Sequence, residues 1–436
     1  MENYDVLIIG GGLAAYYSAL SCRKRGLKVA LIEKALLGGT GIRTGALPVK
    51  KLLDSFKGRE KDRESIKLDL IKNWNKDIKS LENKIENDLL TSGVDLYFGD
   101  GEFLDEHRYS VGDNILYGKY IIIATGTEPS SIGEIEIDNE KIITHKEAID
   151  LDNIPDKIII LGGNVEGIEF ASVYANLGVE VIVVEKEKSV LMGNDEDLVK
   201  PIEDKLVENK VKIIKGIGAK EAYTDGESVK VVLEDGQVFE GDKVLVTLNR
   251  KPNFPKGIER LNILKDKTKI IVDENLRTNI EHIYAIGDIN GILGMAHVAI
   301  QQGIAVSDHI SKNKPVCKHY SSLPRAVYTF PEMAGAGYQE EDLIREGIDY
   351  IKGYSYLSNT WRGWAKDIEE GFVKILFHRN GKLLGIWMVG ENVSEYIGPL
   401  GVLLEKNITV DDIKHNLIIH PTLWESVLDA ILNAER

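Results

Sequence analysis

The sequence predicts an α/β protein built from more than one domain. The chain has 436 residues, which exceeds the roughly 250–300 residues at which a single hydrophobic core stops growing. A pattern of buried strand, glycine turn, helix and second strand begins at Asp5 and begins again at Lys157. Chains that alternate strands and helices in this way form parallel sheets covered by helices.

The two copies of this pattern have equal internal spacing. Gly10 and Glu33 are 23 positions apart, and so are Gly162 and Glu185. This order, ending in an acid, is the fingerprint of a Rossmann-like dinucleotide-binding domain. Two ordinary βαβ units are the alternative, but the repeated spacing favours two dinucleotide sites. Two such sites in one chain suggest an electron path from a nicotinamide to a flavin.

Each residue type in the fingerprint has a physical role. The first glycine allows a tight turn, the middle one lets a pyrophosphate approach the backbone, and the third small residue lets helix and strand pack closely. The free N–H groups and positive end of the helix hold the phosphates, and the final acid accepts hydrogen bonds from ribose hydroxyls. The predicted binding residues are Gly10, Gly12, Leu13, Ala14, Ala15, Glu33 and Lys34 in the first copy, and Gly162, Asn164, Gly167 and Glu185 in the second.

The remaining pattern predicts three domains. Further buried strands are expected at 120–127, 243–250 and 283–288, and a helix is expected at 295–313. The two Rossmann-like domains are predicted at 1–150 with 263–315, and at 151–262, followed by an α+β domain at 316–436. Within this last domain, Asn380-Gly381 predicts a hairpin turn.

The composition excludes several classes of function. A net charge of −15 disfavours nucleic-acid binding. No apolar run approaches the roughly 18 residues of a membrane span. The first strand begins too near Met1 to leave room for a signal peptide, so we expect a cytoplasmic protein. The two cysteines, Cys22 and Cys317, are too few for a disulfide framework, and no motif predicts a bound metal.

Further motifs match one family. They are Ala124-Thr125-Gly126, Arg250-Lys251-Pro252-Asn253, Ala285-Ile286-Gly287-Asp288, Met295-Ala296-His297 and His420-Pro421-Thr422-Leu423-Trp424-Glu425. With the two fingerprints, they make the chain resemble the flavin-dependent pyridine nucleotide-disulfide oxidoreductases, most closely the dihydrolipoyl dehydrogenases, over essentially its whole length. The resemblance implies FAD bound by the first Rossmann-like domain, NAD bound by the second, and a C-terminal domain that forms a homodimer.

The resemblance also implies further binding residues. Asp288 would hold the ribityl chain of FAD, and Ala296 and His297 would lie beside the flavin ring. The residues added in this way are Gly39, Thr40, Lys50, Ala124, Thr125, Gly126, Gly287, Asp288, Met295, Ala296 and His297 for FAD, and Asn249 for NAD.

The redox-active cysteine pair of the family is absent. In the family two cysteines lie five positions apart on a helix after the first βαβ unit, and the matching positions here are Gly41 and Ala46. Neither side chain can form a thiolate or a mixed disulfide. The family's dithiol–disulfide exchange is therefore excluded unless a partner supplies the thiols. Replacing both cysteines is also expected to leave open space on that side of the flavin.

The resemblance assigns catalytic roles to two pairs of residues. Lys50 would approach the flavin and pair with Glu169, because a stranded buried charge costs about 3–5 kcal/mol. His420 would be the acid–base residue that reaches the partner subunit's flavin site, with Glu425 orienting its ring. Ile418 replaces a further histidine of the family, and the His420–Pro421 peptide bond is predicted to be cis.

The second fingerprint departs from the pattern. Asn164 replaces its middle glycine, so a side chain would project toward the pyrophosphate. Glu166 adds negative charge nearby, and Asn249 replaces the glycine that usually precedes Arg250. Glu185 favours NAD over NADP, because an acid repels a 2′-phosphate. NAD binding is therefore less certain than FAD binding.

Three functions are compatible with these residues. The first is an oxidoreductase that passes electrons from NADH through FAD to a small non-disulfide acceptor such as a quinone, oxygen or a metal ion. The second is a non-catalytic FAD-bound homodimer that binds a partner such as a lipoyl-bearing protein. The third retains dihydrolipoyl dehydrogenase activity with external thiols. Reduction of the flavin by NADH distinguishes the first from the second.

Overall fold

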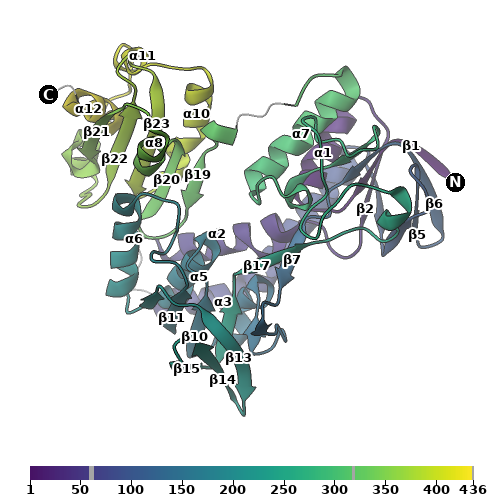
Figure 1. Ribbon diagram of the computed structural model, residues 1–436, viewed down its shortest axis with the longest axis horizontal. Helices are drawn as coiled ribbons and strands as arrows, with labels where there is room; N and C mark the ends of the chain where they lie inside the picture. The colour runs from purple at the N-terminus through teal and green to yellow at the C-terminus, as the bar shows by residue number, and fades with distance from the viewer. Residues whose placement is uncertain (58–62, 317–319, 435–436) are drawn as a thin grey trace. The chain divides into compact units, whose positions relative to one another are not determined.

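The computed structural model describes residues 1–57, 63–316 and 320–434. The chain divides into two compact units. The first contains residues 1–52, 65–154 and 248–318, and the second contains residues 53–64, 155–247 and 319–436. Each unit is therefore assembled from segments that lie far apart in the sequence (Figure 1).

The first unit is built on a mixed sheet with the strand order β3–β2–β1–β6–β5–β4 and with β18 beside β6. Strands β1, β2, β3, β6 and β18 are parallel, and β4 and β5 join as antiparallel strands. Runs of Ile, Leu and Val bury both faces of the central strands, as parallel sheets require. The strands are β1 Glu2–Ile9, β2 Val29–Glu33, β3 Asp95–Phe98, β4 Gly101–Phe103, β5 Arg108–Val111, β6 Asn114–Ile123 and β18 Ile283–Ala285.

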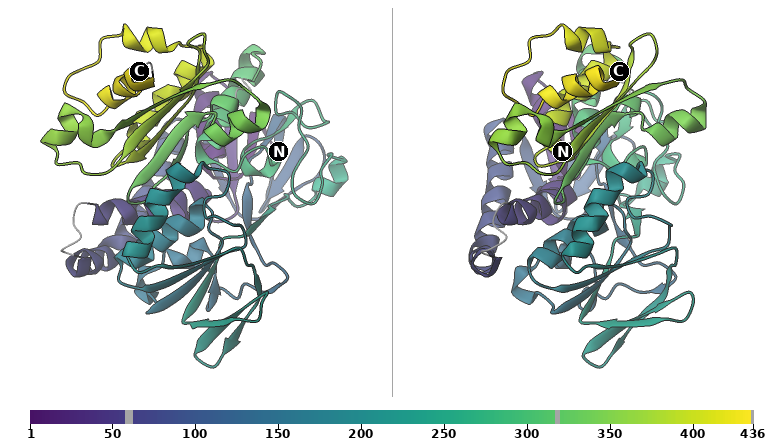
Figure 2. Two further views of the ribbon diagram at one scale, coloured as in Figure 1. Left: turned by 60° about the vertical axis from the view of Figure 1, so that its left-hand side comes forward. Right: turned by 90° about the vertical axis from the view of Figure 1, so that its left-hand side faces the viewer.

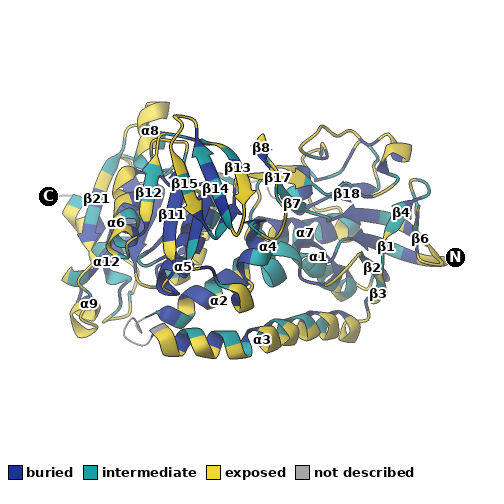
Figure 3. Ribbon diagram, turned by 90° about the horizontal axis from the view of Figure 1, so that it is seen from below, coloured by how far each residue is buried: buried dark blue, intermediate teal, exposed yellow. Residues whose placement is uncertain are grey.

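Helices α1 (Leu13–Lys24) and α7 (Ala296–Lys312) pack side by side in this unit (Figure 1). Their small residues allow close contact, because a Cβ atom at Gly303 would lie within 3.0 Å of the Ala14 carbonyl oxygen. Helix α3 exposes much of its surface (Figure 3). The other elements are α2 Ala46–Phe56, α3 Arg63–Thr91, α4 His145–Ala148, the π-helical turn η1 Thr40–Thr44, the 3₁₀ turns η3 Leu151–Asn153, η4 Ile258–Leu261 and η5 Gly287–Asn290, and the strands β7 Thr127–Ser130, β8 Glu134–Ile135, β9 Ile142–Ile143 and β17 Asn249–Pro252.

The second unit repeats the strand–turn–helix pattern. Parallel strands follow the order β12–β11–β10–β16, and β15–β14–β13 form an antiparallel sheet. The elements are β10 Lys157–Leu161, α5 Val165–Asn176, β11 Glu180–Glu185, α6 Glu196–Glu208, β12 Lys212–Lys215, β13 Ala219–Asp225, β14 Ser228–Leu233, β15 Val238–Gly241 and β16 Lys243–Val246.

The C-terminal part of the second unit is an antiparallel sheet in the order β19–β20–β23–β22–β21. Helices α10 and α12 contribute to the core on this sheet, and Figure 2 shows the yellow C-terminal helices lying against it. The elements are η6 Tyr320–Ser322, β19 Arg325–Val327, β20 Glu332–Gly337, α8 Glu340–Glu346, β21 Ile351–Tyr356, η7 Leu357–Asn359, α9 Trp361–Ala365, β22 Phe372–Phe377, β23 Leu383–Gly390, α10 Ser394–Glu405, α11 Val410–Lys414 and α12 Glu425–Ala434.

These elements confirm the predicted α/β fold with two Rossmann-like folds and an α+β C-terminal region. The predicted hairpin is also confirmed, because β22 and β23 are antiparallel and Gly381 between them has a φ of +84°. The His420–Pro421 peptide bond is cis, as predicted.

Candidate dinucleotide sites

The first glycine turn brings two parallel strands close together at their carboxyl ends. Gly10 has a φ of +112°, and a Cβ atom there would lie within 3.0 Å of the Ala124 carbonyl oxygen. Both the backbone conformation and the space therefore require glycine. The ends of β1 and β6 therefore meet closely, and the carboxyl ends of parallel strands are the position at which α/β sheets bind ligands.

The amino end of α1 follows directly after this glycine turn. No side chain caps the first turn of α1, and a Cβ atom at Gly12 would meet nothing within 4 Å among the described residues. Gly39 lies beside it, since a Cβ atom at Gly39 would be 3.0 Å from the Gly12 Cα atom. The uncapped N–H groups and the positive helix end suit a phosphate.

Other predicted residues meet at the same edge. The Thr127 hydroxyl donates to Asp288 Oδ2 at 3.2 Å, and β18 places Asp288 beside the end of β6. Arg250 donates to Thr127 Oγ1 at 2.8 Å and to Thr40 Oγ1 at 3.4 Å. Arg250 was not among the predicted binding residues, although it lies in a motif that carries the resemblance. It connects three segments of this site.

One buried hydroxyl supports a bound group here. Thr125 Oγ1 is buried and has no hydrogen-bond partner among the described residues. Buried polar atoms in native proteins are almost always satisfied, so this hydroxyl needs a partner that a ligand would supply. With the open helix end and Asp288, this observation supports the expectation that these residues hold FAD.

The remaining predicted FAD residues lie on the surrounding elements. Glu33 ends β2 and accepts from the Ala35 N–H at 2.9 Å. Gly287 has a φ of +74° and would place a Cβ atom 3.3 Å from that of Ala14. The others are Lys34 after β2, Ala15 buried on α1, Gly126 after β6 with a φ of +64°, Met295 and Ala296 at the start of α7, and the exposed His297.

The second glycine turn has the same backbone shape. Gly162 has a φ of +109°, and a Cβ atom at Gly167 would lie within 3.0 Å of the Gly162 carbonyl oxygen. Helix α5 therefore packs directly on the end of β10. Glu185 ends β11 and accepts from the N–H groups of Gly163 at 2.5 Å and Glu187 at 2.7 Å.

The two turns differ at the middle position. The Asn164 side chain caps α5, because its Oδ1 accepts from the Gly167 N–H at 3.0 Å while its Nδ2 donates to the Thr247 carbonyl at 2.7 Å. One of the free N–H groups at this helix end is therefore already hydrogen-bonded. NAD fits the Glu185 end of the site, but it would compete with Asn164 at the pyrophosphate end.

We expect Asn164→Gly to tighten NADH binding. The substitution frees the Gly167 N–H and costs only a few tenths of a kcal/mol of helix stability. One additional hydrogen bond to a charged phosphate, about 1.5 kcal/mol, lowers the dissociation constant roughly tenfold. Isothermal titration with NADH measures this change. Thr409→Gly, which removes the capping side chain of α11, is the control and should leave NADH binding unchanged. An unchanged or weaker affinity for Asn164→Gly would contradict this role.

The cysteine positions hold no thiol. Gly41 lies in the turn η1, and Ala46 begins α2. Cys22 is fully buried on α1 and donates to Ser307 Oγ at 3.2 Å. Burial raises the pKa of the Cys22 thiol above its ordinary value, so Cys22 is a small core side chain rather than a nucleophile. Cys317 lies outside the described residues.

The predicted catalytic pairs are placed as follows. Lys50 lies on α2 in the first unit, whereas Glu169 is buried on α5 in the second unit and accepts from the Tyr328 N–H at 3.0 Å. Their pairing stays a prediction.

The side chain of His420 is 60% exposed, and its Nδ1 lies 2.7 Å from Glu425 Oε1.

The Glu425 carboxylate is built to hold this histidine. Desolvation raises the pKa of Glu425, but hydrogen bonds from His420 and from the Thr422 N–H outweigh it and lower the pKa below its ordinary value. A carboxylate that stays ionised fixes the orientation of the ring and leaves Nε2 for proton transfer. The catalytic role of His420 remains a prediction.

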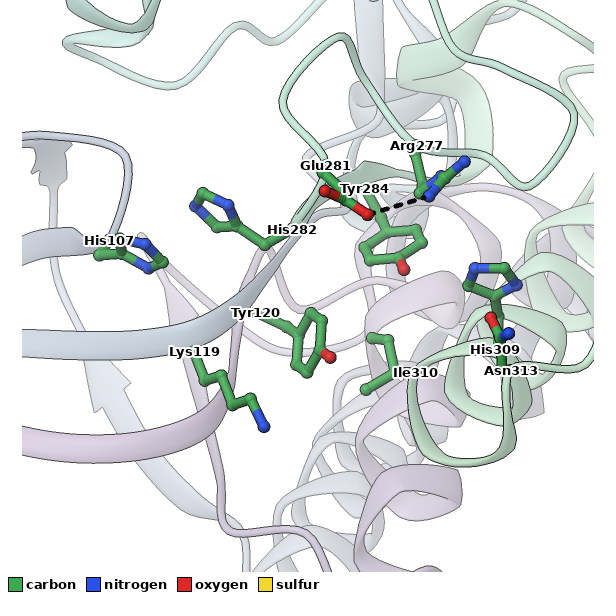
Figure 4. A pocket seen from close by; sticks show the side chains of 10 residues that line it. All are labelled: His107, Lys119, Tyr120, Arg277, Glu281, His282, Tyr284, His309, Ile310 and Asn313. Atoms are coloured by element: carbon green, nitrogen blue, oxygen red, sulfur yellow. Dashed lines mark ion pairs between the residues drawn. The ribbon is translucent and has the colours of Figure 1, made fainter.

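A separate pocket of about 410 Å³ opens on the first unit (Figure 4). His107 and His282 stack in it with ring centroids 4.0 Å apart, and each bonds one ring nitrogen to a backbone carbonyl. None of the predicted dinucleotide-site residues lines this pocket.

Among the described residues, no group of three His, Cys, Asp or Glu side chains could hold a metal ion. No helix in the described part of the chain is long and apolar enough to cross a membrane.

Comparison with known proteins decides the family. Residues 4–303 match the model of the pyridine nucleotide-disulphide oxidoreductases, and residues 323–431 match that family's dimerisation domain. The chain belongs to this family. Family members of the dihydrolipoyl dehydrogenase type are oxidoreductases that use FAD and NAD(H). The match to the dimerisation domain supports a homodimer, and that segment exposes the large side chains of Trp361, Trp364, Leu417 and Ile419.

Several relatives span nearly the whole chain. A dihydrolipoamide dehydrogenase from Chaetomium thermophilum is 34% identical over 98% of this chain and 90% of its own length. A leghemoglobin reductase from Vigna unguiculata is 32% identical over 99% of this chain and 87% of its own length. Among solved structures, the Cu(II) complex of a cysteine-to-serine mutant of the HOCl-induced flavoprotein disulfide reductase RclA from Escherichia coli has a TM-score of 0.90 and 25% identity, covering 99% of both chains.

Proposed function

We propose that this protein is an NADH-dependent flavoprotein that delivers electrons to a non-disulfide acceptor. The observation that carries the proposal is the contrast within the first unit. The residues at the ends of β1 and β6 fit FAD, whereas the two positions that would hold the thiols are Gly41 and Ala46. In this proposal residues 1–150 and 263–315 bind FAD, 151–262 bind NAD, and 316–436 form the homodimer.

The residues of this chain would then hold and position the reactants. When bound, FAD can accept hydride from NADH and pass the electrons to the acceptor. The amino end of α1 would bind the pyrophosphate, and Asp288 the ribityl chain. Lys50 with Glu169 would supply a fixed positive charge at the flavin. The ring of His420, oriented by Glu425, would hold a proton for an acceptor that needs one.

An oxidised metal ion is the acceptor class that we propose first. The RclA structure is a Cu(II) complex of a cysteine-to-serine variant, and another relative is named a leghemoglobin reductase. The leghemoglobin reductase name supports an acceptor other than a disulfide, and the Cu(II) complex supports copper binding by a protein with this fold that is itself named a disulfide reductase. One NADH carries two electrons, so it would reduce two Cu(II) to Cu(I) and release NAD⁺ and a proton.

The test is an anaerobic titration with NADH, followed by mixing with Cu(II), a quinone or lipoamide. We expect stoichiometric loss of the flavin absorption band and reoxidation by Cu(II) or quinone at least ten times faster than by lipoamide. Free FAD at the same concentration is the control. Fastest reoxidation by lipoamide would favour dihydrolipoyl dehydrogenase activity with external thiols.

The capped helix α5 favours a second candidate function. If Asn164 prevents nucleotide binding, the flavin band persists at saturating NADH in the wild-type protein and disappears in Asn164→Gly. That result would indicate a non-catalytic FAD-bound homodimer, whose partner would then be sought among lipoyl-bearing proteins.

A further inference from the structure

The space beside Gly41 is filled by a side chain of this protein. A Cβ atom at Gly41 would lie within 3.0 Å of Leu13 Cδ1 and 3.1 Å from Leu13 Cγ, with the Ala296 Cβ atom at 3.9 Å. The φ angle of Gly41 lies outside the left-handed range. The neighbouring leucine, and not the backbone conformation, therefore disfavours a larger residue here, because Leu13 would have to shift. The open space expected from the loss of the cysteine is absent at Gly41.

The backbone of Leu13 is fixed close to Gly41, and its side chain is half-buried. It is the first residue of α1, directly after the Gly10–Gly12 turn that fixes the amino end of the helix. The turn η1, which carries Gly41, approaches the same helix end, because Gly39 contacts Gly12. A larger residue at position 41 would have to displace Leu13 or move this turn.

We propose that Leu13 is a specificity-determining residue that occupies the space a cysteine at position 41 would need. Its side chain keeps a thiol, or a sulfur atom of a substrate, away from this place beside α1. Only acceptors that take up electrons without bonding to a sulfur atom at position 41 would then be reduced. The role of Leu13 in the reaction rests on the proposed function. The packing of Leu13 against position 41 can be tested independently of that function.

The first test is a double-mutant cycle on the purified flavoprotein. Gly41→Ala adds only the clashing methyl group, and we expect it to lower the melting temperature by roughly 4–8 °C, because overpacking is destabilising. In the Leu13→Ala background the same substitution should cost less than half as much, because the space has been vacated. Gly241→Ala is the control, since its methyl group would make only ordinary contacts of 3.4 Å or more.

The outcome of this cycle decides the packing claim. Non-additive shifts in melting temperature support it, and additive shifts overturn it. The flavin content of each variant, read from its absorbance, shows whether the shift accompanies loss of FAD. Neither reading requires an acceptor, so a failure of the proposed function would not alter either result.

The second test asks whether Leu13 excludes the thiol pair. Diamide accepts two electrons and two protons when two thiols join, so closure of an engineered pair removes two thiols from an Ellman titration. We expect closure in Leu13→Ala/Gly41→Cys/Ala46→Cys and less than half as much in Gly41→Cys/Ala46→Cys. Equal closure in both variants, or closure in neither, would overturn the assignment of Leu13 as the excluding residue.

Discussion

Replacing Lys374 with methionine is expected to destabilise the second unit by about 3–5 kcal/mol, the cost of breaking a buried ion pair from one side. The Lys374 side chain is fully buried on β22, and its ammonium contacts Asp195 at 2.7 Å and Asp197 at 2.6 Å. Methionine fills a similar volume but leaves the buried Asp195 carboxylate without its counter-charge. Calorimetry should show a fall in melting temperature of roughly 10 °C.

Lys352→Met provides the matched control. Lys352 lies on the neighbouring strand β21 and pairs with Glu340 at 2.9 Å, but its side chain is 46% exposed. Exposed pairs contribute about 0–1 kcal/mol, so this variant should melt within roughly 2–3 °C of the wild type. Equal melting temperatures for the two lysine variants would show that burial of the Lys374 pair contributes nothing.

The same cluster gives a pH dependence. Burial raises the pKa of Asp195, but Lys374 and the N–H groups of Glu340 and Glu341 outweigh it and hold the pKa below its ordinary value. A lowered pKa in the folded state contributes stability that is complete above the unfolded value of about 3.9 and is lost as the pH falls through the folded value. Urea unfolding between about pH 6 and 3 should therefore show a smaller acid-induced loss for Asp195→Asn than for the wild type.

Gly10→Ala is expected to abolish FAD binding. The added methyl group would meet the Ala124 carbonyl oxygen within 3.0 Å, and the φ of +112° is unfavourable for alanine. The strand ends must separate, which displaces Thr125 and Asp288 from each other. Overpacking and backbone strain together exceed about 3 kcal/mol. Separation of the strand ends relieves this strain and FAD binding would have to restore it, so the affinity should fall by more than a hundredfold. Flavin absorbance of the purified variant measures the loss.

Gly26→Ala separates the two causes of this effect. Gly26 also has a positive φ of +81°, but a Cβ atom there would meet nothing within 4 Å among the described residues. It should therefore lose some stability through backbone strain while retaining its flavin. If Gly26→Ala loses FAD as completely as Gly10→Ala, the contact with Ala124 is not the cause.

Local patterns predicted much of the fold. Each βαβ unit could be read from its apolar strand, glycine turn and terminal acid, because these features depend on residues within one short segment. The hairpin at Asn380-Gly381 and the helix of residues 296–312 were predictable for the same reason. Asp288 was assigned to the FAD site only through the family resemblance, and its hydrogen bond from Thr127 was not predicted.

Contacts between distant segments were not predictable. The cap formed by Asn164 depends partly on the Thr247 carbonyl, which β16 brings to the end of β10. The contact of Leu13 with Gly41 depends on how η1 folds back on α1. Because these distant partners were not visible in the sequence, Asn164 was expected to project toward the pyrophosphate and Gly41 was expected to have open space beside it.

The Lys374 cluster was missed although the sequence contains a signal for it. The strand Phe372-Val373-Lys374-Ile375-Leu376-Phe377 is apolar except for one lysine. A single charge within a buried strand requires an opposite charge nearby. Its partner Asp195 is 179 positions away, so the sequence indicates the need for a counter-charge but cannot identify it.

The contacts around Asp195 also bear on how this protein can evolve. The Asp195 N–H donates to the Gln339 side chain, and the Asp195 carboxylate accepts from the Glu340 and Glu341 N–H groups. The Lys374 ammonium donates to the same carboxylate. Residues 155–247 thus supply counter-charges for the core of the C-terminal region. Natural selection would therefore retain this nucleotide-type segment for folding even in a lineage that no longer used the nucleotide, because a gene deletion removing it would leave Lys374 buried without its two nearest counter-charges.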